Sequence, residues 1–176
     1  MDFNALQLLL LDVDGVLTDG RLVYRERSDG VDEFNDRPSD EIKVFHVHDG
    51  RAIRSWLDSG RQVALISGRD GAAVRRRAAE LGIILLRSAV SDKSAAFQAL
   101  LRETGVPPAA TIYVGDDAPD LGPMRSCGLP VAVANAAAEV KRAAVYVTRR
   151  RGGEGAVAEV IDWLGQKERA AAGRRG

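Results

Sequence analysis

Uninterrupted aliphatic runs alternate with segments of helical periodicity along this chain. Runs of apolar residues that end in polar or glycine residues are typical of strands buried on both faces of a parallel sheet. Between these runs, apolar residues recur at spacings of three and four, as on the buried face of a helix. The pattern predicts strands at residues 8–11, 63–66, 83–86, 111–114, 131–134 and 145–147, with helices between them and a last helix before residue 166.

This order of elements predicts an α/β fold: a doubly wound, Rossmann-like parallel sheet in a single domain, residues 1–166. A small β-hairpin, at about residues 20–48, is inserted after the first strand, with arms at 21–25 and 41–47. Neither this insert nor the segment between the second and third strands is long enough for a cap domain. The basic, Ala/Gly-rich residues 167–176 are expected to form a disordered tail.

Composition narrows the functional classes. The 176 residues carry 25 Lys and Arg against 25 Asp and Glu, so no net positive field attracts nucleic acid. There is no apolar stretch of 18 residues and no signal-peptide pattern, which predicts a cytoplasmic protein without a membrane partner. The single Cys127 excludes an intrachain disulfide and is expected to be a small packed residue.

Asp12 and Asp14 directly follow the first apolar run, at the carboxyl end of a strand, where open α/β sheets bind their ligands. Two like charges this close are unfavourable unless a cation or a shared proton relieves them, and Mg²⁺ with a phosphate substrate would do so. The segment can also be an ordinary Asp/Gly turn. A calcium loop does not fit, because Gly15 occupies the fourth position and Val23 the twelfth.

Further polar residues follow the later strands: Ser67, Lys93 near a helix start, and Asp116 with Asp117. The carboxyl ends of parallel strands share one edge, so these side chains are expected to meet there. An anionic nucleophile, a metal site and donors for phosphate oxygens are what phosphoryl transfer requires. Taken singly, Ser67 can be a turn residue and Lys93 a solvated charge.

These motifs match, in order, the four motifs of the haloacid dehalogenase superfamily. The segments 12–20, 45–50, 67–69, 115–117 and 151–157 more narrowly resemble the 3-deoxy-D-manno-octulosonate 8-phosphate phosphatase family, and the resemblance covers nearly the whole chain. It implies a phosphatase that releases a sugar acid from its phosphate. A related branch acts on nine-carbon sugar acid 9-phosphates, and another small phosphomonoester remains an alternative.

The resemblance implies that Asp12 is the nucleophile and Asp14 the general acid and base. Mg²⁺ would be held by the Asp12 carboxylate, the Asp14 backbone carbonyl and Asp116, while Ser67 and Lys93 would bind the phosphate. Two supporting acids, Asp117 and Asp120, would hold Lys93 and the loop; Asp120 can also be a plain helix N-terminal acid.

The sugar acid needs a cationic group for its carboxylate, and Arg offers a bidentate fork. The resemblance implies substrate roles for Arg54, Arg69 and Arg77, with Arg69 marking the octulosonate branch. His46 and His48 alternate along the second hairpin arm and stand where the family often has Asn and Arg; a zinc site would need a third ligand. The remaining residues expected to line or support the site are Asp49, Gly50, Gly68, Gly153 and Gly155.

An uncapped site is open to water unless neighbouring chains close it. The apolar hairpin offers strands for pairing between subunits, the resemblance implies a homotetramer, and the Gly-rich segment 152–155 is expected to reach an active site. Two other classes of protein are alternatives. A response-regulator receiver uses similar residues in a different order, and a phosphatase-like domain could act as an inactive oligomerisation or regulatory module.

Overall fold

The computed structural model describes residues 2–24 and 41–173. Six strands form one parallel sheet in the order β5-β4-β1-β6-β7-β8, which confirms the doubly wound α/β fold. A three-residue helical turn, η1 (Phe3–Ala5), precedes the first strand. The strands are β1 (Leu8–Asp12), β4 (Gln62–Ile66), β5 (Leu85–Arg87), β6 (Thr111–Gly115), β7 (Leu129–Ala132) and β8 (Tyr146–Val147).

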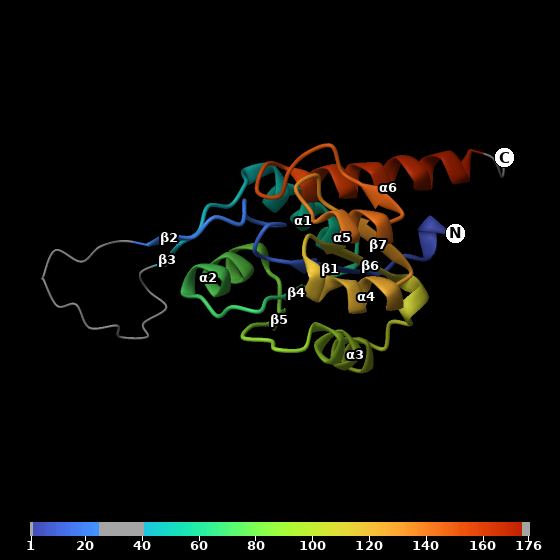
Figure 1. Cartoon of the computed structure of the whole chain (residues 1–176). Coiled ribbons are helices and arrows are strands. Elements are labelled where there is room, and N and C mark those ends of the chain that lie inside the picture. Colours follow the sequence, from blue (N-terminus) through green and yellow to red (C-terminus); the bar gives the residue numbers. More distant parts are fainter. Residues whose placement is uncertain (1, 25–40, 174–176) are drawn as a thin grey trace, which may run out of the picture.

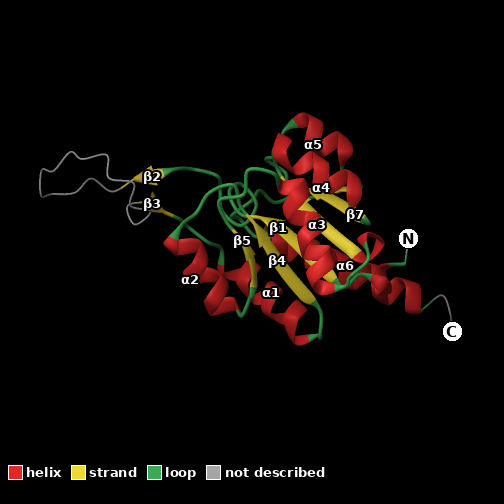
Figure 2. Cartoon of the chain, turned by 90° about the horizontal axis from the view of Figure 1, so that it is seen from below, coloured by secondary structure: helices red, strands yellow, loops and turns green. Residues whose placement is uncertain are grey.

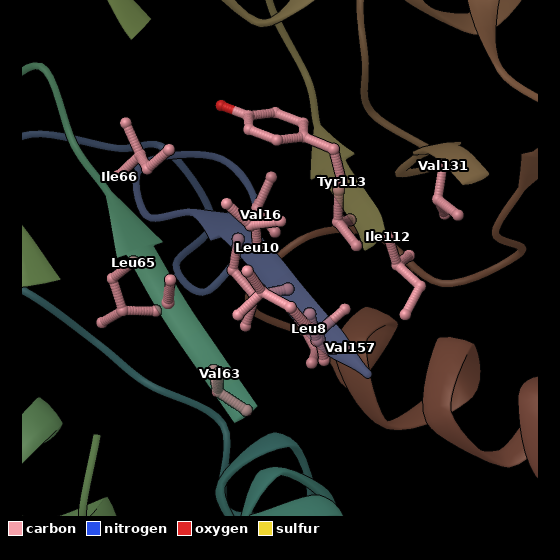
Figure 3. Packing of buried hydrophobic residues seen from close by; sticks show 14 of the residues in the cluster. Leu8, Leu10, Val16, Val63, Leu65, Ile66, Ile112, Tyr113, Val131 and Val157 are labelled. Carbon is pink, nitrogen blue, oxygen red and sulfur yellow. The ribbon is translucent and has the colours of Figure 1, made fainter. Parts of the chain in front are cut away.

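The first strand lies at the centre of the sheet and of the core. Leu8, Leu9, Leu10 and Leu11 are completely buried, as expected for a strand with helices on both faces. Figure 3 shows side chains of β1 packed among those of β4, β6 and α6. Because β1 pairs with β4 on one side and β6 on the other, the residues that follow these three strands emerge side by side.

Helices cover both faces of the sheet (Figure 2). The helices α1 and α6 pack against each other on one face, and α2 contacts α1; α3, α4 and α5 contact one another in turn. Figure 1 shows α1 and α6 above the sheet and α3 and α4 below it. Their bounds are α1 (Val47–Asp58), α2 (Ala72–Leu81), α3 (Lys93–Thr104), α4 (Leu121–Ser126), α5 (Ala138–Ala143) and α6 (Ala156–Ala172), with short turns η3 (Pro108–Ala110) and η4 (Ala118–Asp120).

The inserted hairpin projects from the body of the molecule (Figure 1). Its paired strands, β2 (Val23–Tyr24) and β3 (Glu41–Ile42), are much shorter than the predicted arms. The expectation of a second arm over 41–47 is wrong, because α1 begins at Val47. The polar loop over 26–40 lies outside the described residues. No cap domain is inserted in the described chain, as expected.

The C-terminal region also departs from expectation. Residues 167–172 of the expected tail continue α6, whereas residues 174–176 lie outside the described residues. The helix is held because Val157, Val160 and Leu164 are fully buried and Glu168 forms an ion pair of 2.8 Å with Arg61. Within the described residues, no helix combines the length and apolar character needed to cross a membrane.

Candidate active site

The structure brings the residues that follow three neighbouring strands to one edge of the sheet. Asp12 is the last residue of β1 and pairs with Ile66, the last residue of β4, so Ser67 stands next to it. Asp116 directly follows β6 on the other side. This is the arrangement predicted from the parallel topology.

Lys93, the first residue of α3, joins the carboxylates of this edge. Its ammonium group lies 2.7 Å from Asp12 Oδ1 and 2.7 Å from Asp120 Oδ1. The fully buried Asp120 also accepts a hydrogen bond of 2.8 Å from the Tyr113 hydroxyl. Its second oxygen, Oδ2, accepts from the backbone N–H groups of residues 116 and 117. Asp120 is therefore a buried anchor for Lys93 and the loop after β6, in addition to its place at a helix N-terminus.

Asp117 has a different place from the one expected. Its carboxylate accepts a hydrogen bond of 2.8 Å from the backbone N–H of Ala118, in a capping box with Asp120. The residue is exposed, and no ion pair joins it to Lys93 in the described chain. Asp117 supports the turn after β6, and the task of holding Lys93 falls to Asp120.

Three carboxylates at this edge could hold a metal ion: one oxygen each of Asp12, Asp116 and Asp120 lie within 4.8 Å of one another. The two carboxylate oxygens of Asp120 already accept hydrogen bonds from four donors. Asp116 Oδ1, in contrast, is buried with no hydrogen-bond partner within the described parts. A side chain at Gly15 would overlap the Asp116 carboxylate, so the glycine leaves room for it. Hard carboxylate oxygens, one of them unpaired, fit Mg²⁺.

The electrostatics of the group also call for a cation. Burial, reinforced by the charge of Asp120, raises the pKa of Asp12 well above its usual value, and Lys93 only partly opposes this. Burial likewise raises the pKa of Asp116 to about 6. Burial works to lower the pKa of Lys93, but Asp12 and Asp120 outweigh it and raise that pKa. A carboxylate nucleophile must be ionised, so the ionised form of Asp12 requires a further positive charge at the site.

Asp14 does not belong to the carboxylate trio. Its Oδ1 atom instead receives a hydrogen bond from the ammonium group of Lys43, just beyond the hairpin strand β3. Lys43 also contacts Glu41 Oε1 at 3.1 Å, and Glu41 forms an ion pair of 3.3 Å with Arg69. Sequence analysis missed Lys43, because a lysine in a polar, hairpin-like segment carries no signal of burial.

The loop after β4 holds Ser67, Gly68 and Arg69. Ser67 is fully buried, and its hydroxyl donates to the Arg69 carbonyl at 2.9 Å while accepting from the Arg69 N–H at 3.1 Å. Gly68 is exposed at the bend, and the Arg69 side chain is 44% exposed. The residue Ser67 thus follows the strand position opposite Asp12, with its hydroxyl bonded to the Arg69 backbone, and the Arg69 guanidinium projects beside the hairpin.

The two histidines are not on a strand. His46 caps the N-terminus of α1, where its Nδ1 accepts from the His48 backbone N–H at 3.2 Å, and the two rings contact each other. His48 lines a groove of about 760 Å³ between α1, α6 and the segment after β8, which none of the edge carboxylates lines. The expectation that the two histidines lie on the second hairpin arm is wrong, and the structure does not bring His48 to the carboxylates.

Asp49, also expected to line the site, is buried in the first turn of α1. Its Oδ1 accepts a hydrogen bond of 2.8 Å from the backbone N–H of Ala158, in the first turn of α6. Burial raises the pKa of Asp49, although backbone hydrogen bonds, led by that of Ala158, oppose this. In the described structure Asp49 therefore joins the two helices.

The other two arginines differ in position. Arg54 donates to the Leu81 carbonyl at 3.0 Å, at the end of α2 remote from the carboxyl ends of the strands, so the structure does not bring it to the site. Arg77 lies over the Phe45 ring and so close to Gly50 that a side chain there would overlap its guanidinium. It therefore stands beside the start of α1.

The glycine-rich segment before α6 docks onto the loop after β1. The Gly152 N–H donates to Asn135 Oδ1 at 2.6 Å, and Asn135 Nδ2 donates to the Gly15 carbonyl at 2.9 Å. Gly153, with φ +71°, donates to the Val16 carbonyl at 3.0 Å, and Gly155 begins α6 with φ +95°. Sequence analysis missed Asn135, whose neighbours in sequence are mostly alanines.

Comparison with known proteins gives a consistent result. A family model for haloacid dehalogenase-like hydrolases matches residues 80–161. The chain is 40% identical over 163 residues to the 3-deoxy-D-manno-octulosonate 8-phosphate phosphatase of Haemophilus influenzae, covering 93% of this chain and 84% of that protein. It is 44% identical over 159 residues to the phosphatase of that name from Escherichia coli strain K12, covering 90% and 79%.

A solved structure agrees as well. The 3-deoxy-D-manno-octulosonate 8-phosphate phosphatase from Moraxella catarrhalis, in complex with a magnesium ion, a phosphate ion and a KDO molecule, superimposes with a TM-score of 0.85. It is 32% identical, and the match covers 99% of this chain and 96% of that chain. Identity at this level over most of both sequences, with agreement in fold, shows that the chain belongs to the 3-deoxy-D-manno-octulosonate 8-phosphate phosphatase family of haloacid dehalogenase-like phosphomonoesterases.

Proposed function

We propose that this protein is a magnesium-dependent phosphatase that hydrolyses 3-deoxy-D-manno-octulosonate 8-phosphate to the free sugar acid and phosphate. The observation that carries the proposal is the buried group of Asp12, Lys93 and Asp116 at the sheet edge, with one Asp116 oxygen unpaired. The relative from Moraxella catarrhalis, solved with magnesium, phosphate and KDO, supports the choice of metal and sugar acid.

The Asp12 and Asp116 carboxylates and the Asp14 backbone carbonyl would hold Mg²⁺. Bound there, the ion would offset the repulsion between the anionic nucleophile and the phosphate group. The raised pKa values of the two carboxylates support this assignment, because a divalent cation favours their ionised forms.

Asp12 acts as the nucleophile. One of its carboxylate oxygens forms a bond to phosphorus while the bond between phosphorus and the sugar oxygen breaks, and the bonding electrons leave with that oxygen. Lys93 and the Ser67 hydroxyl bind the phosphoryl oxygens from two directions. Asp120 keeps Lys93 in place for this, since it contacts the ammonium at 2.7 Å.

Asp14 moves the protons. Its carboxyl group protonates the departing sugar oxygen, and the resulting carboxylate then takes a proton from the water that attacks the aspartyl-phosphate. This second step breaks the bond between phosphorus and Asp12 and releases inorganic phosphate. The side chain of Asp14 is partly exposed, at 24%, as a group that meets both substrate and water must be.

Arg69 is proposed to bind the carboxylate of the sugar acid, because its guanidinium is accessible beside the site and suits a bidentate contact. Arg77, Gly50 and Gly68 stay as predicted neighbours of the substrate. We no longer propose substrate-binding roles for Arg54, His48 and Asp49, since each of them makes a structural contact or lies away from the carboxylates.

The assembly proposed is a homotetramer in the cytoplasm. The hairpin exposes large apolar side chains that a second copy could cover, among them Leu22, Tyr24 and Val44. Light scattering at micromolar concentration should give four times the chain mass of 18.9 kDa. A monomeric mass under those conditions would contradict the tetramer.

The function is tested by phosphate release from a panel of sugar and sugar acid phosphates. We expect Mg²⁺-dependent turnover, greatest for the eight-carbon sugar acid 8-phosphate, abolished by excess EDTA and by Asp12→Asn in a folded protein. Preference for a nine-carbon 9-phosphate would favour the related branch. No turnover on any phosphomonoester, with the assembly intact, would favour the inactive oligomerisation or regulatory module.

A further inference from the structure

We infer that Lys43 is a positioning residue that holds the Asp14 carboxyl group in its working orientation; the inference rests on the proposed function. The side chain of Lys43 is only 2% exposed although it carries a full charge. Its ammonium group donates to Asp14 Oδ1 and, at 3.1 Å, to Glu41 Oε1. Lysine is seldom buried without a partner, so these two contacts account for its position.

The charges around Lys43 form a balanced set. Glu41, whose side chain is 8% exposed, contacts both Lys43 and Arg69, and Asp14 completes two acids against two bases. Removing an ammonium group from water costs several kcal/mol, which only close opposite charges offset. The pairs therefore tie three separate segments: the loop after β1, the base of the hairpin and the loop after β4.

The contact is specific for one oxygen of Asp14. Lys43 engages Oδ1, and within the described chain Oδ2 has no hydrogen-bond partner. A hydrogen bond to one oxygen restricts the rotation of a carboxyl group, so its other oxygen points in a fixed direction. Oδ2 is then the atom that exchanges the proton with the leaving sugar oxygen. Lys43 acts through Asp14, without touching the reacting atoms.

A different role is a direct contact between Lys43 and the anionic substrate. That role predicts a rise in KM with kcat retained, whatever the leaving group. Positioning of Asp14 predicts a loss that depends on the leaving group. A sugar alkoxide needs a proton as it departs, whereas a nitrophenolate departs without one. The two roles therefore differ in a quantity that can be measured.

The experiment compares Lys43→Met with Lys43→Arg, and uses the exposed Lys167→Met on α6 as a control. In single-turnover measurements, Lys43→Met should slow phosphorylation by the sugar acid phosphate at least tenfold, and by nitrophenyl phosphate less than threefold. Lys43→Arg should recover most of the difference, and Lys167→Met should behave as wild type. Equal losses on the two substrates, or a change in KM alone, would overturn the inference.

Two further variants keep the test decisive. In an Asp14→Asn background, Lys43→Met should slow the sugar substrate no further. The two Tm losses should sum to more than the loss in the double variant, because both changes break the Lys43–Asp14 pair, while Lys43→Met alone also breaks the contact with Glu41. Should Lys43→Met fold poorly, Glu41→Gln should show the same dependence on the leaving group to a smaller extent. Wild-type protein without phosphatase activity would refute the proposed function, while additive Tm losses would refute the pair itself.

Discussion

Lys93 and Asp120 form a hydrogen-bonded ion pair of 2.7 Å in which both side chains are almost entirely buried. A buried pair of this kind has unequal consequences when either partner is lost, because the other charge stays behind without compensation. If Asp120 were lost, Lys93 would still have Asp12 as a partner. The Tyr113 hydroxyl and the backbone N–H groups of residues 116 and 117 would lose the oxygen that accepts their hydrogen bonds. The structural cost is thus concentrated on Asp120.

Asp120→Ala should lower the free energy of unfolding by about 3–5 kcal/mol, since it leaves the Tyr113 hydroxyl and two backbone N–H groups without their acceptor and removes one of the two carboxylate partners of Lys93. Asp120→Asn, of the same shape, should cost less. Urea titration followed by circular dichroism measures both, with the exposed Asp162→Ala as control. A loss under about 1 kcal/mol for Asp120→Ala would contradict the anchoring role.

Arg69→Ala should reduce kcat/KM for the sugar acid phosphate more than for a neutral hexose phosphate. The expected difference is about 1.5–3 kcal/mol, the range for a charge-assisted hydrogen bond. Steady-state kinetics on both substrates provide the measurement. Arg76→Ala, an exposed change on α2, should leave the ratio unaltered. Identical losses on both substrates would remove Arg69 from carboxylate recognition.

Gly152→Ala should disturb the loop after β1, which follows the nucleophile Asp12. A methyl group at residue 152 would overlap the Gly15 carbonyl, which is backbone and cannot swing aside. We expect kcat/KM to fall about tenfold or more, as for a small misplacement of reacting groups. Gly165→Ala is the matched control, because only the flexible Arg169 side chain approaches it. Unchanged kinetics in a folded Gly152→Ala protein would show that the contact between residue 152 and the loop after β1 does not position the reacting groups.

Deleting residues 152–176 is a poorer test of this segment. From the sequence alone, such a deletion is expected to alter mainly substrate affinity and product release, with folding checked by circular dichroism because the last helix can also pack on the core. In the structure it would also remove the fully buried Val157, Val160 and Leu164 from the core. Each large core side chain lost costs about 2–5 kcal/mol, so the truncated chain should not fold.

Glu159 should make stability depend on pH. Burial acts to raise its pKa, but hydrogen bonds from the Arg149 and Arg150 N–H groups and the Tyr146 hydroxyl outweigh it and lower the pKa below the usual 4.5. A lowered pKa means that the stabilisation is complete above about 4.5 and is lost as pH falls through the folded value.

Replacement of Glu159 by Gln should therefore cost about 1 kcal/mol near neutral pH and nothing at the acid end of the range. Tm measured from pH 7 down to pH 3 for both proteins gives the comparison. Parallel Tm curves, with a constant gap between the two proteins, would show that the charge of Glu159 does not matter.

The sheet and the strand-end residues could be predicted because each rests on a local pattern. The run Leu8 to Leu11 specifies a buried strand, and parallel pairing then places Asp12, Ser67 and Asp116 together. The start of α1 could not be predicted in this way. Around Phe45, apolar and polar residues alternate as they do in a strand, whereas the structure has His46 as the cap of α1.

Contacts between distant residues were beyond sequence reasoning. Lys43 reaches an aspartate 29 residues earlier, and Asn135 reaches Gly15 across 120 residues. Neither residue belongs to a sequence motif that indicates a long-range contact, and lysine and asparagine both occur commonly on protein surfaces. Only the folded arrangement reveals that one is buried against Asp14 and that the other joins two loops.

The central place of β1 has a consequence for how the protein is made. During synthesis Leu8 emerges before its pairing partners Gln62 and Thr111. The loop after β1 must wait longer still, for Asn135 and Gly152. A nascent chain therefore carries an apolar strand that lacks one or both of its pairing partners until β6 has emerged, and chaperones can bind this strand on the ribosome. Activity should appear only after α6, as far as the buried Leu164, has left the exit tunnel.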